Sequence, residues 1–248
     1  MAVKKLPDPF LNLVHGELER LEQRLPAALH VWRDASDMGW HVAKKAELGF
    51  ARRHGALVEM RGVVEALREC GDLDVDEANA LVSRLAKAEK DVREVARLSG
   101  ERWRKAVKGR RTPKRELDAL EEVRRELVGC IVFCGSAEAE LEHWVTREPY
   151  LHGDDEVDDL DLEAEDWQRA VDDAVRHLRR WAPPGKRAPK GCRLLEVLID
   201  ECALGLSDVR AEVERARMVT KDAKGAQEIR DFLERLPGRH RVARVGVN

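Results

Sequence analysis

The chain has 248 residues, of which 43% are hydrophobic, 38% charged and 4% aromatic, and its formal net charge is −3. This length allows one large domain or two small ones, and so small a net charge points to no particular class of partner. The longest uncharged apolar stretch, 11 residues over 127–137, is much shorter than the roughly 20 residues that cross a bilayer, so no membrane segment is expected.

The cysteines and the N-terminus favour a reducing compartment. The five cysteines are an odd number and are too sparse for a disulfide scaffold, and most lie on apolar helix faces. Two lysines lie near the N-terminus, but Asp8 and Glu17 interrupt the apolar residues that follow them, unlike in a signal peptide. We therefore expect a soluble, cytoplasmic protein.

Amphipathic helices are predicted along most of the chain, because apolar residues recur at three-and-four spacing. The first helix should begin at Pro9, directly after the capping residue Asp8. Pro26 should kink or end this helix, because an interior proline removes a hydrogen bond and clashes with the preceding turn.

The second and third helices are bounded by clear signals. The second covers 40–70 and stops at Gly71, and its interior glycines suggest a bend or a close helix contact near Gly55. The third follows a capping box made by Asp74 and Glu77. It then carries a strict heptad seam: Ala78, Leu81, Leu85, Ala88, Val92 and Val95.

The fourth helix starts at Pro113, and its middle, over 127–137, is apolar all round. A helix without a polar face is surrounded on all sides, so we expect it at the centre of the first bundle. The acidic segment that follows, 149–162, is predicted to be a solvated linker.

Beyond the acidic segment a further seam covers 164–181, and a basic loop with prolines follows it. The next helix carries apolar residues over 195–216, with a break expected at 205–207. A last short helix should cover 226–236, before a basic tail.

The predicted fold is therefore all-α, a bundle of about seven helices. We expect an N-terminal bundle over 1–148, the acidic linker 149–162 and a C-terminal helical subdomain over 163–248 that ends in the basic tail. The two groups could instead pack together as one body, because three helices make a thin core alone.

Charges are strongly segregated along the chain. Residues 138–166 contain 13 acids and one arginine, whereas 176–193 contain seven basic residues and no acid. Residues 101–115 contain one acid and eight basic residues: Arg102, Arg104, Lys105, Lys108, Arg110, Arg111, Lys114 and Arg115. Three explanations fit this pattern: charge pairing within the chain together with helix dipoles, an acidic protein partner, or the phosphates of a nucleic acid.

Three motifs resemble metal sites but lack essential parts. The acids from Asp154 follow EF-hand spacing, but the sixth position is not the required glycine. Glu140 and His143 have the spacing of di-metal helical bundles without the second pair that such a site needs. Cys130 and Cys134 share a helix face without zinc-type spacing, which favours core packing. We expect no metal and no cofactor.

No nucleotide-binding or hydrolase motif is present in the sequence, which favours a non-enzyme. The leading hypothesis is a cytoplasmic adaptor or regulatory subunit that binds other proteins through its helix faces. Binding through the helix faces is excluded if every heptad seam is buried within the monomer. Self-association is compatible with the same heptads. The alternative is a nucleic-acid-binding module, or a small subunit of a nucleoprotein complex, that contacts phosphates through 101–115.

Overall fold

The computed structural model describes residues 9–34, 40–107, 114–147, 154–181 and 190–235, and all of its regular structure is helical. The helices in these ranges are α1 (Pro9–Asp34), α2 (Trp40–Glu69), α3 (Val75–Val107), α4 (Lys114–Arg147), α5 (Asp154–Trp181) and α6 (Lys190–Arg235). The all-α prediction is confirmed, with six helices in the described ranges instead of about seven. None of these helices is both long and apolar enough to cross a bilayer.

Most of the local boundary signals of the first three helices hold. Helix α1 begins at Pro9 as predicted, but it does not end at Pro26, which lies inside the helix. Helix α2 is followed by Gly71 at a φ of 76°, a left-handed conformation that glycine adopts without strain. The Asp74 carboxylate accepts hydrogen bonds from the backbone amides of Asp76 at 3.0 Å and Glu77 at 3.2 Å, so it caps α3.

The break predicted at 205–207 is wrong, because α6 is a single helix of 46 residues. Gly205 is buried, and a Cβ added there would lie 2.9 Å from the Sγ of Cys134 on α4. This glycine therefore allows two helices to approach closely and does not interrupt the helix. The two helices predicted over 195–216 and 226–236 are likewise parts of α6, as far as Arg235.

The predicted linker is wrong over 154–162, which form the first turns of α5, while 149–153 lie outside the described residues. The acidic residues favour this start, because carboxylates near a helix N-terminus complement its dipole. Val157, Leu160 and Ala164 are buried and anchor these turns in the core.

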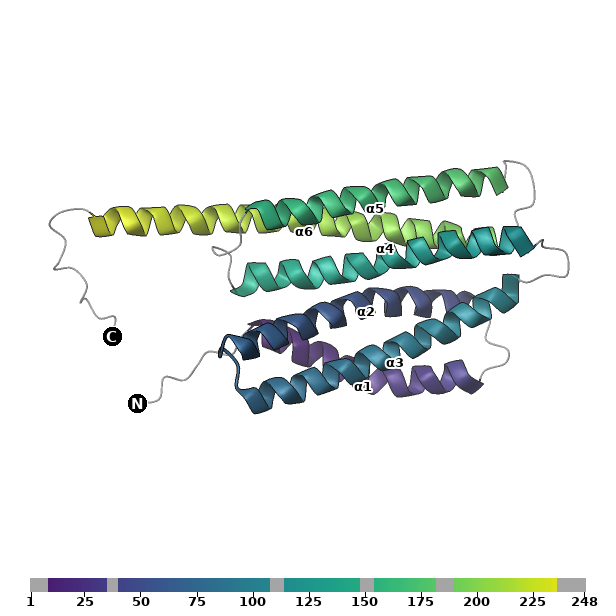
Figure 1. Ribbon diagram of the computed structural model, residues 1–248, viewed down its shortest axis with the longest axis horizontal. Helices are drawn as coiled ribbons and strands as arrows, with labels where there is room; N and C mark the ends of the chain where they lie inside the picture. Colours follow the sequence, from purple (N-terminus) through teal and green to yellow (C-terminus); the bar gives the residue numbers. More distant parts are fainter. Residues whose placement is uncertain (1–8, 35–39, 108–113, 148–153, 182–189, 236–248) are drawn as a thin grey trace.

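The helices form two three-helix bundles that lie side by side, α1–α3 and α4–α6, each around its own core (Figure 1). Successive helices run in opposite directions. Helix α4 belongs to the second bundle and lies on the side of it that faces the first. Its middle faces α2 on one side and α6 on the other. It is therefore central to the molecule, as its all-round apolar surface predicted, but it does not form the centre of the first bundle.

Bare backbone contact joins the two bundles where α2 crosses α4. A Cβ on Gly55 of α2 would overlap the carbonyl oxygen of Val132 and lie 2.8 Å from the amide nitrogen of Ser136. A Cβ on Gly135 of α4 would overlap the carbonyl oxygen of Arg52. Both glycines are buried, so the close helix contact predicted near Gly55 is confirmed.

An ion-pair network lies directly beside this crossing. The Arg52 side chain of α2 donates hydrogen bonds at 3.0 Å to Glu138 of α4 and at 3.0 Å to Asp208 of α6. One guanidinium thereby holds three helices from both bundles, with the bidentate geometry that arginine favours.

We expect the Gly55→Ala variant to lose about 3 kcal/mol of unfolding free energy, because the new methyl group can be accommodated only by separating two backbones. Gly62→Ala is the matched control in the same helix, since nothing lies within 4 Å of a Cβ added there. It should gain up to about 1 kcal/mol from helix propensity. Urea unfolding followed by circular dichroism measures both values, and equal stability of the two variants would contradict a backbone contact at Gly55.

Candidate functional site

The predicted basic segment 101–115 spans the end of α3 and the start of α4. Lys105, Lys114 and Arg115 are exposed, and Arg104 donates to Glu121 at 3.0 Å. The Arg102 side chain, together with Lys108, Arg110 and Arg111, lies outside the described part of the chain. Half of the predicted site residues are therefore placed, and one of these four is engaged in an internal ion pair.

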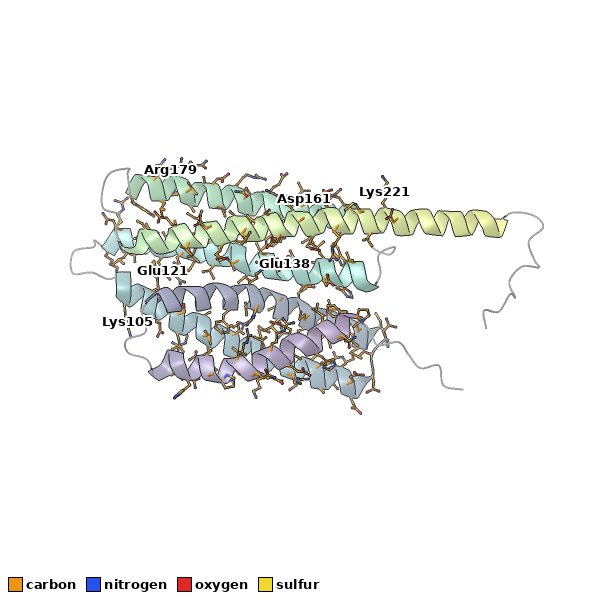
Figure 2. The ribbon with its side chains drawn as sticks, turned by 180° about the vertical axis from the view of Figure 1, so that it is seen from behind. Lys105, Glu121, Glu138, Asp161, Arg179 and Lys221 are labelled. Carbon is orange, nitrogen blue, oxygen red and sulfur yellow. The ribbon has the colours of Figure 1, made fainter. Side chains whose placement is uncertain are left out.

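The fold brings this segment close to the second basic segment, 176–193. Helices α3 and α5 end at the same end of the molecule, where α4 and α6 begin (Figure 1). Figure 2 shows Lys105 and Arg179 at this end, whereas Asp161 and Lys221 lie toward the other. Lys105 and Arg179 are both exposed. We call this end, with its described cations Arg104, Lys105, Lys114, Arg115, Arg176, Arg179 and Arg180, the basic end.

Among the residues that the structure describes, the acidic segment pairs with α6 and with no cation of either basic segment. Arg217 of α6 contacts Asp158 at 2.6 Å and Asp161 at 2.9 Å in the first turns of α5. Arg215 contacts Glu142 of α4 at 2.6 Å. Internal charge pairing therefore accounts for part of the acidic segment. At the basic end it accounts for Arg104 and Arg176, which pair with Glu121 and Asp173.

The residues with metal-like spacing have other surroundings in the fold. The acids from Asp154 lie on a helix and cannot form a calcium loop. The His143 ring packs edge-on against Phe10 with ring centroids 4.9 Å apart. Within the described ranges, no three His, Cys, Asp or Glu side chains are placed to hold a metal ion.

Three buried thiols meet where α4 packs on α6: Cys130 and Cys134 of α4, and Cys202 of α6. Cys202 donates to the carbonyl oxygen of Leu127 at 3.2 Å. The hydrogen bond with Cys130, together with burial, raises the pKa of the Cys134 thiol. The hydrogen bond with Cys134 lowers the pKa of Cys130, but its hydrogen bond with Cys202 and burial raise it overall. Cys130 and Cys134 therefore stay protonated and unreactive, which supports a packing role.

A charged groove that the sequence analysis missed lies over α3, between α1 and α2. Its floor contains Glu89, which is only 4% exposed. The Glu89 carboxylate accepts a hydrogen bond from Arg61 of α2 at 2.7 Å and a second from Arg93. The one signal in the sequence was that Glu89 flanks the heptad seam, a position that often pairs with charges on neighbouring helices.

His54 of α2 fixes Arg93 from another direction. The Nε of Arg93 donates to His54 Nε2 at 2.9 Å. Burial, followed by the nearby charge of Arg93, lowers the pKa of His54 below its ordinary value of 6.5. The imidazole is therefore neutral at neutral pH and serves as an acceptor that orients the guanidinium.

Comparison with known proteins adds no functional assignment. No protein family, curated protein or solved structure shows significant similarity to this chain. The groove, the basic end and the exposed length of α6 therefore have to be interpreted from their own geometry.

Thiol reactivity tests the packing role of the cysteines. Cys70 is exposed and the other four cysteines are buried, so one thiol should react rapidly with Ellman's reagent in the folded protein. All five should react once guanidinium unfolds the chain. The Cys70→Ser variant should lose the fast phase entirely. A fast phase that persists in this variant would place a reactive thiol in the α4–α6 contact and contradict the packing role.

Proposed function

We propose that this protein is a cytoplasmic adaptor or regulatory subunit that binds a partner protein through the C-terminal part of α6. The supporting observation is the length of that helix. Helix α6 has 46 residues against 28 in α5, which corresponds to about 69 Å against about 42 Å. Its C-terminal part projects beyond the ends of α4 and α5 (Figure 1). We call residues 221–235 the α6 arm.

The apolar seams within the two bundles are already buried, although single apolar residues such as Leu204 are exposed. The α3 seam is buried throughout. The buried faces of α1, α4 and α5, and of α6 up to Ala216, likewise belong to the two cores. The binding mode that needed an exposed seam within the bundles is therefore excluded for these helices. In the part of α6 that projects beyond the bundles, the sequence continues the apolar spacing with Ala226, Ile229 and Leu233.

The last described contacts of α6 with the bundle lie directly before the arm. Arg217 makes ion pairs with the first turns of α5, and Thr220 is buried. Beyond that point the helix continues for about 22 Å to Arg235. An isolated helix of this length is marginal in water, but this one continues an anchored helix, so its nucleation step is already complete. Apolar residues at this spacing favour docking into a groove of a partner protein.

Replacing Ile229 and Leu233 together by Asp should abolish partner capture from lysate of the source organism. Two apolar anchors contribute about 1.5–3 kcal/mol each when buried, so affinity should fall at least about tenfold. The matched control is Lys224→Gln with Gln227→Asp, which makes the same charge change on the opposite side of the helix. It should retain capture. Quantitative mass spectrometry of the captured proteins and circular dichroism of each variant provide the readout.

Two results would contradict this proposal. The first is equal capture by the double-Asp variant and the control. The second is a dimer, measured by light scattering, that only the double-Asp variant loses, because it would show that the arm binds a second copy of the chain.

We propose nucleic-acid binding as a second candidate, supported by the gathering of two basic segments at one end of the molecule. Cations near the C-termini of α3 and α5 also complement the helix dipoles. That explanation does not cover Lys114 and Arg115, which lie in the first turn of α4. A surplus of exposed cations at one end favours the displacement of counterions from phosphates.

Changing Arg110, Arg111, Lys114 and Arg115 to Glu should abolish this binding. Fluorescence anisotropy with duplex DNA and single-stranded RNA, from about 50 to about 200 mM salt, measures it. The logarithm of affinity of the unchanged protein should fall linearly with the logarithm of salt, by about 0.9 per phosphate contact on duplex DNA. The control reverses four basic residues away from the basic end: Arg20, Arg24, Lys87 and Lys221. Equal binding by both variants, or binding insensitive to salt, would contradict this candidate.

A further inference from the structure

The groove over α3 is a cavity of about 550 Å³, within the range of small-molecule sites. We propose that it binds a compact polyanion with phosphate chemistry, such as a pyrophosphate group. This inference is independent of the adaptor function, because the groove belongs to the α1–α3 bundle and the arm to α6.

The lining of the groove is almost entirely charged. Eight of its nine residues carry a charge, five of them positive, and the ninth is an alanine. They are Arg33, Arg61, Ala86, Glu89, Lys90, Asp91, Arg93, Glu94 and Arg97. The lining contains no aromatic ring, and Ala86 is its one uncharged residue, so the charged groups favour a small ligand rich in oxygen.

Three of the cations are held in place by carboxylates. Glu89 pairs with Arg61 and Arg93, as described above. Glu94 accepts from Arg97 at 2.7 Å and 2.9 Å. A guanidinium that is already oriented loses less entropy when it donates its remaining N–H groups to an anion. The acids of the groove therefore position its arginines as well as neutralising them.

The groove keeps a positive surplus after this pairing. Five cations against three acids leave a charge of +2, and counting Glu101, which contacts Arg97 from outside the groove, still leaves +1. Arg33 and Lys90 are exposed and have no ion pair within 4.0 Å among the described residues. A polyanion would neutralise this surplus, and it would accept the paired N–H donors that arginine presents to phosphate oxygens.

A gain in folding stability alone is a weak explanation for the charged residues that line the groove. Burying a carboxylate to pair it with arginines often gives little or no net stabilisation compared with apolar packing. Besides the hydrogen bond with Arg97, the charge of Arg33 contributes to lowering the pKa of Glu94, but the excess of cations in the groove still adds repulsion between them. A ligand that binds only the folded state would offset the cost of the buried carboxylate and the repulsion between cations, because it would stabilise the protein by mass action.

The test is isothermal titration calorimetry of the full chain with sodium pyrophosphate and, separately, with orthophosphate at about 0.15 M salt. The variant Arg33→Gln with Lys90→Gln should weaken pyrophosphate binding by about tenfold or more, because it removes two charges that no internal ion pair requires. The matched control is Arg24→Gln with Lys87→Gln, exposed residues on the same two helices outside the groove. It should leave the affinity within about twofold.

Three outcomes would overturn the inference. The unchanged protein could bind neither pyrophosphate nor phosphoinositide vesicles, or the two variants could have equal affinity for pyrophosphate. The third is that citrate binds as tightly as pyrophosphate. Vesicle binding that requires Arg33 and Lys90, without pyrophosphate binding, would support the phosphate chemistry and assign it to a lipid headgroup. The variant with Ile229 and Leu233 changed to Asp should bind pyrophosphate normally, so failure of the arm proposal remains distinguishable from failure of this one.

Discussion

The backbone contact between α2 and α4 is the constraint on which the rest of the arrangement depends. Gly55 and Gly135 each lie against the main chain of the other helix, at a separation that excludes any side chain. Because this contact brings two three-helix bundles together, α2 and α4 are each covered on two sides, whereas α1, α3, α5 and α6 keep outward faces. Arg52 lies beside the crossing and extends the joint to α6. The groove and the arm both occur on helices that the crossing leaves exposed.

The alternating direction of the helices decides where the segregated charges gather. Residues 101–115 and 176–193 are distant in sequence, but both follow helices that run toward the same end of the molecule. Acids in the first turns of α5 and cations in its last turn each complement the dipole of that helix. The dipole explains this polarity within one helix. It does not explain the cations that begin α4, so the basic end carries more positive charge than helix formation requires.

Local sequence signals predicted the helices and several of their ends. Contacts between residues distant in sequence determined the features that could not be predicted. The helix class, the cap at Asp74, the stop at Gly71 and the close contact near Gly55 each depend on a few neighbouring residues. The continuity of α6 could not be predicted, because Gly205 is indistinguishable from a helix breaker until Cys134 is seen beside it. The groove was missed for a similar reason: Arg93 lies one helical turn from Glu89, but the second partner of Glu89, Arg61, is distant in sequence. Of the predicted site, only Arg104, Lys105, Lys114 and Arg115 have described side chains.

The groove and the α6 arm are joined only through the rigid parts of the two bundles. A ligand in the groove would contact α1, α2 and α3, whereas a partner on the arm would contact the far end of α6. Coupling between two such sites requires an element with two arrangements that both ligands bias. The α2–α4 crossing is poorly suited to that role, because two backbones in direct contact leave no side chain that could change rotamer between them. The two proposed binding functions are therefore expected to be independent of each other.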